Sequence, residues 1–293
     1  MDLMKIAIVT DSTAYLTKEE QQKYHIKVVV IPVIIDGKEY QEGVDLTTEA
    51  FYQKLKTSNS FPSTSQPPVG EMIELYESLA HEGYDTVISI HLASTISGFY
   101  SSLEQIAPSI ENIKVIPYDS KITVKLMGYL AIQASKMAKL GRTPEQIIKY
   151  LDNLRSTIDE LFVVDDLQNL VRGGRLSNAS AFIGGILKIK PLLTFDDNSN
   201  EIVAFEKIRS RKKALKRVEE LFAKAQQRAT YPLRALVING NDPKAGNEWA
   251  NKIHELYPEM IIEQSYFGPT IGTHLGDKAL ALAWLRDFDQ DQL

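Results

Sequence analysis

The chain has 293 residues, of which 44% are hydrophobic and 24% charged; it contains no cysteine and its formal net charge is -5. This composition is typical of a globular protein and excludes disulfide scaffolds, thiolate zinc sites, iron–sulfur clusters and cysteine nucleophiles. The acidic balance also argues against a nucleic-acid partner, which normally requires a basic excess.

The amino-terminal segment MDLMKIAIVTDST has one lysine before a short apolar run. It lacks the longer apolar core and the cleavage site of a signal peptide. No apolar run approaches the roughly 20 residues that a membrane-spanning helix requires. We therefore expect a cytoplasmic protein without integral membrane contact.

The first half of the chain alternates short apolar runs with segments of helical periodicity. The apolar runs predict strands covered on both faces, at Met4–Thr10, Lys27–Ile35, Thr86–His91 and Ile113–Tyr118. The helical segments are Thr48–Lys56, Gly70–His81, Val124–Leu140 and Pro144–Ile158. Strand followed by helix, repeated, predicts a parallel sheet with helices on both faces.

The second half has a different pattern, in which strands predominate. Strands are expected at Leu161–Val164, Lys190–Phe195, Glu201–Ile208, Arg234–Asn239 and Met260–Phe267, and helices at Ala179–Leu187 and Leu275–Leu285. The turn-rich residues 196–200 join two of these strands and predict a hairpin. We therefore predict an α/β protein of two domains. Residues 1–160 would carry the parallel sheet, and residues 161–293 a mixed or antiparallel sheet with helices.

Three hydroxyl-rich segments lie at the expected ends of strands or starts of helices, at Thr10–Thr13, Ser63–Pro68 and Ser94–Gly98. Ligands of an open parallel sheet bind outside the carboxyl ends of its strands. Helix N-termini with neighbouring hydroxyls suit an anion. Helix capping alone explains any one segment, but three at one sheet edge predict a shared site for a carboxylate or phosphate.

The sequence lacks the P-loop, the dinucleotide fingerprint, the zinc-protease helix motif and the nucleophile elbow. An anion-binding protein is therefore favoured over an enzyme. Ser97 paired with His91 or His274 leaves a small serine hydrolase or phosphatase as the alternative. His274 lies in a Gly-rich turn that favours a functional role, although a capping or surface role explains it equally well.

Six separated segments resemble the DegV family: KIAIVTDSTAYL, FPSTSQPPVGE, ISIHLASTISGFYSS, FVVDDLQNLVRGGRLSNASAFIG with KIKPLLTF, EKIRSRKKA and SYFGPTIGTHLGDKAL. DegV proteins are bacterial fatty-acid-binding proteins that serve as the binding subunit of fatty acid kinase. The resemblance covers nearly the whole chain in order. It implies two α/β domains with a long-chain fatty acid, such as palmitate or oleate, buried between them.

The resemblance assigns the carboxylate end of this ligand to three side chains. They are Thr64 of the Thr-Ser-Gln-Pro motif, Ser97 of the Ser-Gly pair and His274 of the Gly-Thr-His-Leu-Gly turn. Ser65 and Ser94, in the same hydroxyl clusters, are further candidates for the carboxylate site. Residues 1–160 would thus hold the carboxylate, and residues 161–293 would cover the acyl chain.

One departure from the family pattern is visible, since the usual Ser-Gly-Thr ends here in Phe99. The substitution removes a hydroxyl from the third position and leaves the role of Ser97 intact. Phe182, Ile183 and Ile186 are candidates for the wall of an acyl tunnel, although an ordinary core helix would show the same pattern.

The resemblance implies carriage in lipid transport or fatty acid metabolism rather than catalysis. A separate ATP-dependent kinase would phosphorylate the carboxyl group of the bound acid, and neither a cofactor nor a metal is expected. The dense basic run of this acidic chain comprises Lys207, Arg209, Arg211, Lys212, Lys213, Lys216 and Arg217. We expect the kinase to dock at Arg209 and Arg211. A solvated helix face explains the run about as well, and nucleic-acid binding is the least favoured interpretation.

Overall fold

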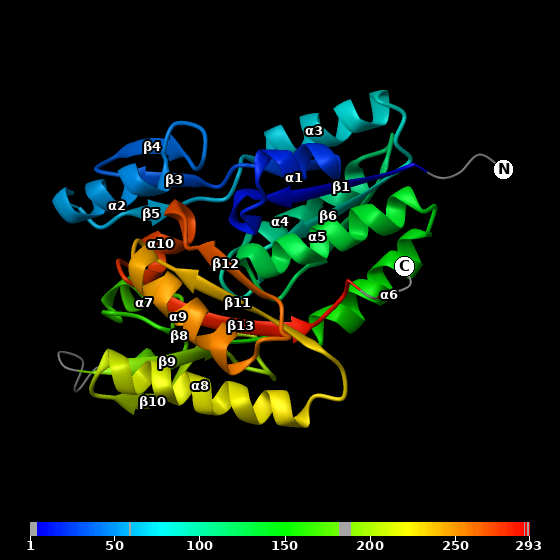
Figure 1. Ribbon diagram of the computed structural model, residues 1–293. Helices are drawn as coiled ribbons and strands as arrows, with labels where there is room; N and C mark the ends of the chain where they lie inside the picture. The colour runs from blue at the N-terminus through cyan, green and yellow to red at the C-terminus, as the bar shows by residue number, and fades with distance from the viewer. Residues whose placement is uncertain (1–4, 59, 182–188, 290, 292) are drawn as a thin grey trace.

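The computed structural model describes residues 5–58, 60–181, 189–289, 291 and 293. Figure 1 shows its sheets and the helices around them. Four parallel strands form one sheet in the order β2-β1-β6-β7. They are β1 (Ile6–Asp11), β2 (Ile26–Val29), β6 (Thr86–His91) and β7 (Lys114–Asp119). Helices α3 (Val69–His81) and α5 (Val124–Lys139) lie on opposite sides of this sheet in Figure 1, as predicted.

Local capping explains where two surface helices of this part begin. Helices α1 (Lys18–Lys23) and α6 (Pro144–Arg155) both start with a capping box, in which Thr17 and Thr143 accept a backbone N–H of the first turn. The remaining elements are the 3-10 turns η1 (Ser12–Ala14) and η2 (Ala107–Ser109), and the helices α2 (Thr48–Thr57) and α4 (Phe99–Ile106).

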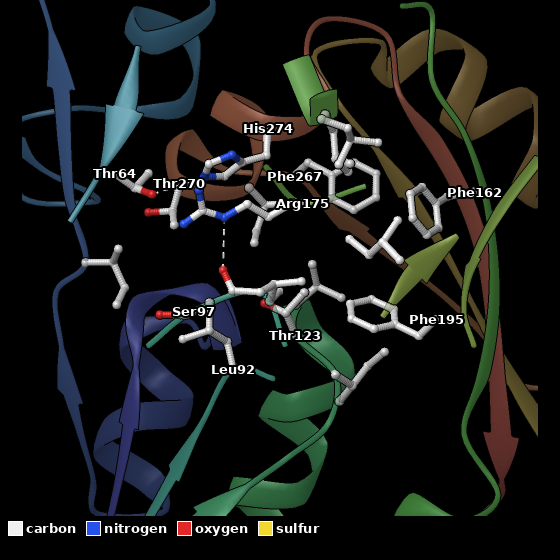
Figure 2. Close-up of a pocket in the computed structure, with 18 of the residues that line it drawn as sticks. Thr64, Leu92, Ser97, Thr123, Phe162, Arg175, Phe195, Phe267, Thr270 and His274 are labelled. Carbon is white, nitrogen blue, oxygen red and sulfur yellow. Dashed lines mark hydrogen bonds between the residues drawn. The ribbon is translucent and has the colours of Figure 1, made fainter. Parts of the chain in front are cut away.

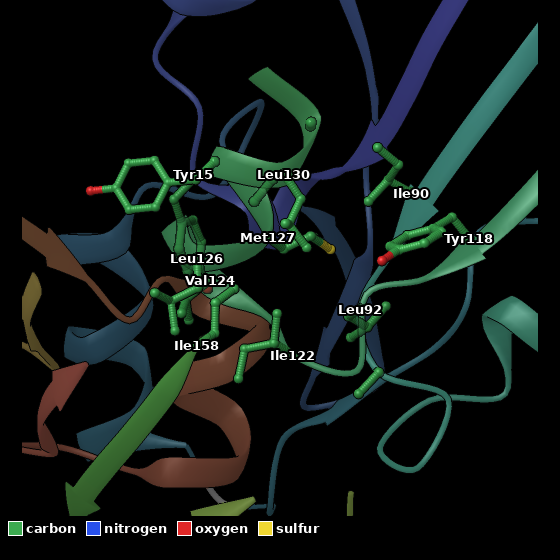
Figure 3. Close-up of a cluster of buried hydrophobic side chains, with 14 of the residues drawn as sticks. Tyr15, Ile90, Leu92, Tyr118, Ile122, Val124, Leu126, Met127, Leu130 and Ile158 are labelled. Carbon is green, nitrogen blue, oxygen red and sulfur yellow. The ribbon is translucent and has the colours of Figure 1, made fainter. Parts of the chain in front are cut away.

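One half of the core of this part lies between the parallel sheet and α5, and α3 and α4 contribute buried residues to the rest of it. Figure 3 shows Met127 and Leu130 of α5 facing Ile90 of β6. All three side chains are fully buried. Burial of such side chains contributes about 1.5–3 kcal/mol each. The near-continuous apolar runs of β1 and β6 follow from this covering on both faces.

The run 27–35, predicted as one strand, forms two strands in different sheets. Strand β2 ends at Val29, and β3 (Pro32–Ile35) joins a small antiparallel sheet of order β4-β3-β5. Its other strands are β4 (Lys38–Gln41) and β5 (Ser63–Thr64). Proline offers no N–H to a ladder and belongs at a strand start, so Pro32 marks the break.

Six strands form the mixed sheet of the carboxyl-terminal part, in the order β10-β9-β8-β13-β11-β12. They are β8 (Asp159–Val163), β9 (Lys190–Phe195), β10 (Ile202–Ile208), β11 (Leu233–Asn239), β12 (Ile262–Tyr266) and β13 (Leu280–Arg286). The pair β11–β12 is parallel and the other pairs are antiparallel. The predicted hairpin and the α/β class with a parallel and a mixed sheet are thereby confirmed. The division at residue 160 stays a prediction.

The two faces of this sheet have different neighbours. Leu161, Leu282 and Trp284 belong to a core shared with helices α8 (Arg211–Arg228) and α9 (Pro243–Leu256). Phe162 and Ala281 belong to the core on the other face, shared with the parallel sheet. The short elements here are α7 (Gln168–Arg172), η3 (Ala179–Ala181) and α10 (Pro269–Leu275).

One expectation about helices needs correction. The predicted closing helix 275–285 is wrong, because α10 ends at Leu275 and residues 280–286 form the central strand β13. Tertiary burial overrides the helix propensity of Leu and Ala there. Helices α8 and α9 were not predicted, and of the predicted helix 179–187 only the 3-10 turn η3 lies within the described residues. Across those residues, no helix combines the length and apolarity needed to cross a bilayer.

Candidate functional site

A cavity lies where the carboxyl ends of the parallel strands meet one face of the six-stranded sheet. Leu92 and Ile122 line it just after β6 and β7, and Phe162, Phe195 and Ala281 line it from β8, β9 and β13. The space inside it that the centre of a water molecule can occupy is about 150 Å³. A single water needs only about 10–15 Å³ by that measure. The cavity is therefore large enough for an organic ligand.

The lining is polar on one side and apolar on the other. Figure 2 shows Thr64, Ser97 and His274 on one side of the cavity, with Phe162 and Phe195 across from them. These residues come from separate parts of the chain: β5, the start of α4, α10, β8 and β9. Such a cavity suits an amphipathic ligand with a small polar head and an extended apolar body.

The polar side centres on a contact between Thr64 and His274. The Thr64 hydroxyl lies 3.0 Å from His274 Nε2. Burial, with a smaller contribution from the positive charge of Arg175, lowers the pKa of His274 to about 4. The imidazole is therefore neutral at pH 7 and carries one N–H. Its Nδ1 is buried without a hydrogen-bond partner among the described residues.

Helix α10 places His274 through contacts at both of its ends. At the start, Glu42 accepts the backbone N–H of Thr270 at 3.1 Å and its hydroxyl at 2.8 Å. Near the end, the imidazole packs against Gly173, where a Cβ would stand 2.5 Å from Nδ1. Real Cβ contacts are never that short, so the ring orientation requires glycine at this position.

Four of the five residues predicted to bind the ligand carboxylate line this cavity: Thr64, Ser65, Ser97 and His274. Ser97 and Gly98 stand at the start of α4, whose free backbone N–H groups add positive potential. The fifth, Ser94, is not among the lining residues. Its hydroxyl is donated to Asp119 at 2.6 Å and ties the loop after β6 to β7.

The serine and histidine pairing of the hydrolase alternative does not form. Ser97 Oγ accepts the backbone N–H of Phe99 at 3.3 Å and makes no hydrogen bond to a histidine within the described part of the chain. His91 is fully buried, with Ser89 at 2.7 Å and Asp11 at 3.0 Å from its two ring nitrogens. His274 is engaged by Thr64. Within the described residues, neither histidine is therefore placed to act as a base for Ser97.

Sequence reasoning missed two charged residues of the lining, Arg175 and Glu160. Arg175 Nε donates to Ile96 O at 3.1 Å, drawn as a dashed line in Figure 2, and Nη1 donates to Gly173 O. The Arg- and Gly-rich segment 171–176 carried a signal for Arg175. No sequence signal marked Glu160, which stands in β8 next to Asp159 and before the apolar residues 161–163.

Two further residues of the lining, Thr123 and Val124, lie at the start of α5. Thr123 donates to Thr13 Oγ1 at 3.0 Å, so the hydroxyl segment after β1 supports a residue of the lining and does not line the cavity itself. Val124 has φ +57°, a strained conformation for a β-branched residue. Strain of this kind is characteristic of ligand sites.

Arg209 and Arg211, the predicted docking residues, do not line the cavity. Arg209 is exposed just after β10, and Arg211 forms an ion pair with Asp242 at 2.9 Å. The candidates for the acyl tunnel, Phe182, Ile183 and Ile186, lie outside the described residues. No group of acidic, histidine or cysteine side chains suited to a metal ion occurs in the described part of the chain.

The sequence was compared with known families and structures. The model of the family described as "Uncharacterised protein, DegV family" matches residues 5–287. The chain belongs to the DegV family. A DegV domain-containing protein of Listeria monocytogenes is 48% identical over 280 residues, covering 96% of this chain and 98% of the relative. Protein DegV of Bacillus subtilis is 44% identical over 282 residues, covering 96% and 99%.

Two solved DegV structures share the fold. DegV of B. subtilis, described as a fatty acid binding protein, superposes with a TM-score of 0.88 at 44% identity and covers 97% of this chain and 100% of its own. A fatty acid binding DegV family protein of Streptococcus agalactiae gives 0.90 at 35% identity, covering 97% and 99%. The two-domain α/β fold is therefore that of the DegV family.

Proposed function

We propose that this protein binds one long-chain fatty acid in the cavity and presents its carboxylate to a fatty acid kinase. The observation that carries the proposal is the cavity itself, polar at Thr64, Ser97 and His274 and apolar at Phe162 and Phe195. Two relatives that share at least 35% identity with the chain are described as fatty acid binding proteins. The binding function is further supported by the coverage of these relatives, which is nearly complete.

Hydroxyl donors and one cation would stabilise the carboxylate. With the hydrogen of the neutral imidazole on Nε2, His274 donates to Thr64 Oγ1, and the Thr64 hydroxyl hydrogen is free for the ligand. The opposite tautomer would bury an N–H of Nδ1 without an acceptor, which is costly. Ser97 supplies a second hydroxyl, and Arg175 offsets the negative charge from the same cavity. A buried carboxylate requires such compensation.

The apolar side would enclose the acyl chain. Burial contributes about 0.8 kcal/mol per methylene, so an extended chain binds tightly even after the entropic cost of association is subtracted. The six-stranded sheet supplies much of this wall, which fits the proposal that residues 161–293 cover the chain. Residues 1–160 would supply the hydroxyls of Thr64 and Ser97, while His274 and Arg175 would reach the carboxylate from the carboxyl-terminal part.

We further propose that the kinase docks at the basic run that follows β10. Arg209 is exposed there, whereas Arg211 is held by Asp242. Arg209 is therefore the better candidate for a direct contact. Ser97 makes no hydrogen bond to a histidine within the described residues, which supports a carrier that leaves phosphoryl transfer to its partner.

Native mass spectrometry of protein purified from bacteria tests the binding function. We expect a co-purified long-chain fatty acid at one molecule per chain, exchangeable for added palmitate or oleate. Protein that stays empty in excess palmitate and oleate would refute the proposal.

A further inference from the structure

Alternate residues of β8 face the same side of the six-stranded sheet. Glu160 therefore lies on the same side as Phe162, where an apolar residue is expected. Glu160 and Phe162 project from β8 into the cavity, while the residues between and after them pack under α8. Only 6% of the Glu160 surface is exposed. Figure 2 shows Phe162 and Phe195, its neighbours, across the cavity from Thr64. A carboxyl group therefore lies in the part of the wall assigned to the acyl chain.

Only one oxygen of this carboxyl group is engaged by the protein. Oε1 accepts the backbone N–H of Phe195 at 2.7 Å and the Thr194 hydroxyl at 3.3 Å. Among the described residues, no donor or acceptor contacts Oε2. Burial, reinforced by the negative charge of Asp159, raises the pKa of Glu160 to about 8. Near pH 7 the group is therefore mostly a neutral acid, and the free Oε2 carries a hydrogen to donate.

Glu160 and Phe195 also separate the cavity from a polar hollow on the surface. Both residues line the hollow, together with Asp119, Arg155 and Asn200. The wall at this point is thus one side chain thick. Glu160 thus borders the cavity on one side and the hollow on the other.

We propose that Glu160 determines specificity for substituted acyl chains, so that the site takes fatty acids with a hydroxyl or oxo group in the half of the chain away from the carboxylate. This inference rests on the proposed function. The neutral acid donates a hydrogen bond to the oxygen of the substituent. A hydrocarbon wall would leave a buried ligand hydroxyl without a partner and would weaken its binding.

The first experiment uses the wild-type protein. Stearate and a series of hydroxystearates, with the hydroxyl moved stepwise from mid-chain to the methyl end, compete with a fluorescent fatty acid for delipidated protein at pH 7. We expect a window of positions in the distal half to bind within about tenfold of stearate, the scale of one net hydrogen bond. Positions outside the window should bind more weakly. Losses above tenfold at every position would overturn the inference, whereas failure of stearate to bind would overturn the proposed function.

Two variants then separate the carboxyl group from the shape of the wall. Glu160→Gln retains an acceptor for the Phe195 N–H and supplies an amide donor, so the preference should persist. Glu160→Met has similar length without a donor. The ratio of its affinity for the favoured hydroxystearate to its affinity for stearate should be about tenfold lower than in wild type.

Phe195→Leu is the matched control, because it reshapes the same wall without changing its polarity. It should alter the affinities for stearate and hydroxystearate by the same factor. If the ratio of the affinities for hydroxystearate and stearate is the same in Glu160→Met as in wild type, Oε2 faces the surface hollow and the inference is overturned. Thermal unfolding verifies that each variant folds. If Glu160→Met does not fold, the series of hydroxyl positions measured on the wild-type protein decides whether the inference holds.

Discussion

Replacing Thr64 by valine probes the carboxylate side of the cavity most directly. The change removes a hydroxyl that lies 3.0 Å from His274 Nε2 and preserves the volume of the side chain. Valine suits the extended backbone of β5 as well as threonine does. A buried charged acceptor then lacks one donor, which costs about 1–3 kcal/mol. The affinity for oleate should therefore fall by about 5- to 150-fold.

The assay is equilibrium displacement of a fluorescent fatty acid from delipidated protein, followed by the rate of oleate release. Thr64→Ser is the matched control, because it keeps the hydroxyl and should stay within a few-fold of wild type. Ser97→Ala should weaken binding by a similar factor, since Ser97 lines the same side of the cavity. Wild-type affinity in the Thr64→Val, Ser97→Ala double variant would refute the reasoning and move the carboxylate elsewhere.

Three further predictions concern ring placement, pH and the partner. Gly173→Ala should weaken oleate binding at least as much as Thr64→Val, since the new Cβ would stand 2.5 Å from His274 Nδ1; unchanged affinity would show that the ring is not held there. In urea unfolding of delipidated protein, the lowered His274 pKa contributes a loss of stability as pH drops from 6.5 toward 4, and the raised Glu160 pKa contributes a loss as pH rises from 4.5 toward 8, so the two slopes oppose each other between pH 4.5 and 6.5. Each slope is at most about 1.4 kcal/mol per pH unit, and each should flatten in His274→Gln or Glu160→Gln respectively. Arg209→Glu should leave oleate binding intact and reduce acyl-phosphate formation by the kinase; loss of both would assign Arg209 to the fold.

The residues of the candidate site that could be predicted from the sequence lie in segments with the composition of turns. Thr64, Ser97 and His274 lie in hydroxyl- or Gly-rich segments whose composition marks a sheet edge, and all three line one cavity. Ser94 has the same local signal, yet its hydroxyl is donated to Asp119 of the neighbouring strand end. Linear sequence does not distinguish a hydroxyl that faces a cavity from one that joins two loops.

The other residues that line the cavity could not be predicted from the sequence, because their position depends on which face of a strand meets the cavity. Glu160 belongs to a strand that was predicted to begin only after it. The pairing with β9 places it opposite Phe195, whose N–H it accepts. Strand starts are the least certain part of a prediction from sequence, and a one-residue slip moves every side chain to the other face.

The error at residues 280–286 and the existence of the cavity have a common cause. In LALAWLR the Leu and Ala residues favour a helix in isolation, but as β13 the segment is central to the sheet. Its large residues Leu280, Leu282 and Trp284 fill the core under α8 and α9, while Ala281 and Ala283 occupy the opposite face. Ala281 lines the cavity, where a larger side chain would fill part of its volume. The small residues that made the segment resemble a helix therefore leave room for the cavity between the two sheets.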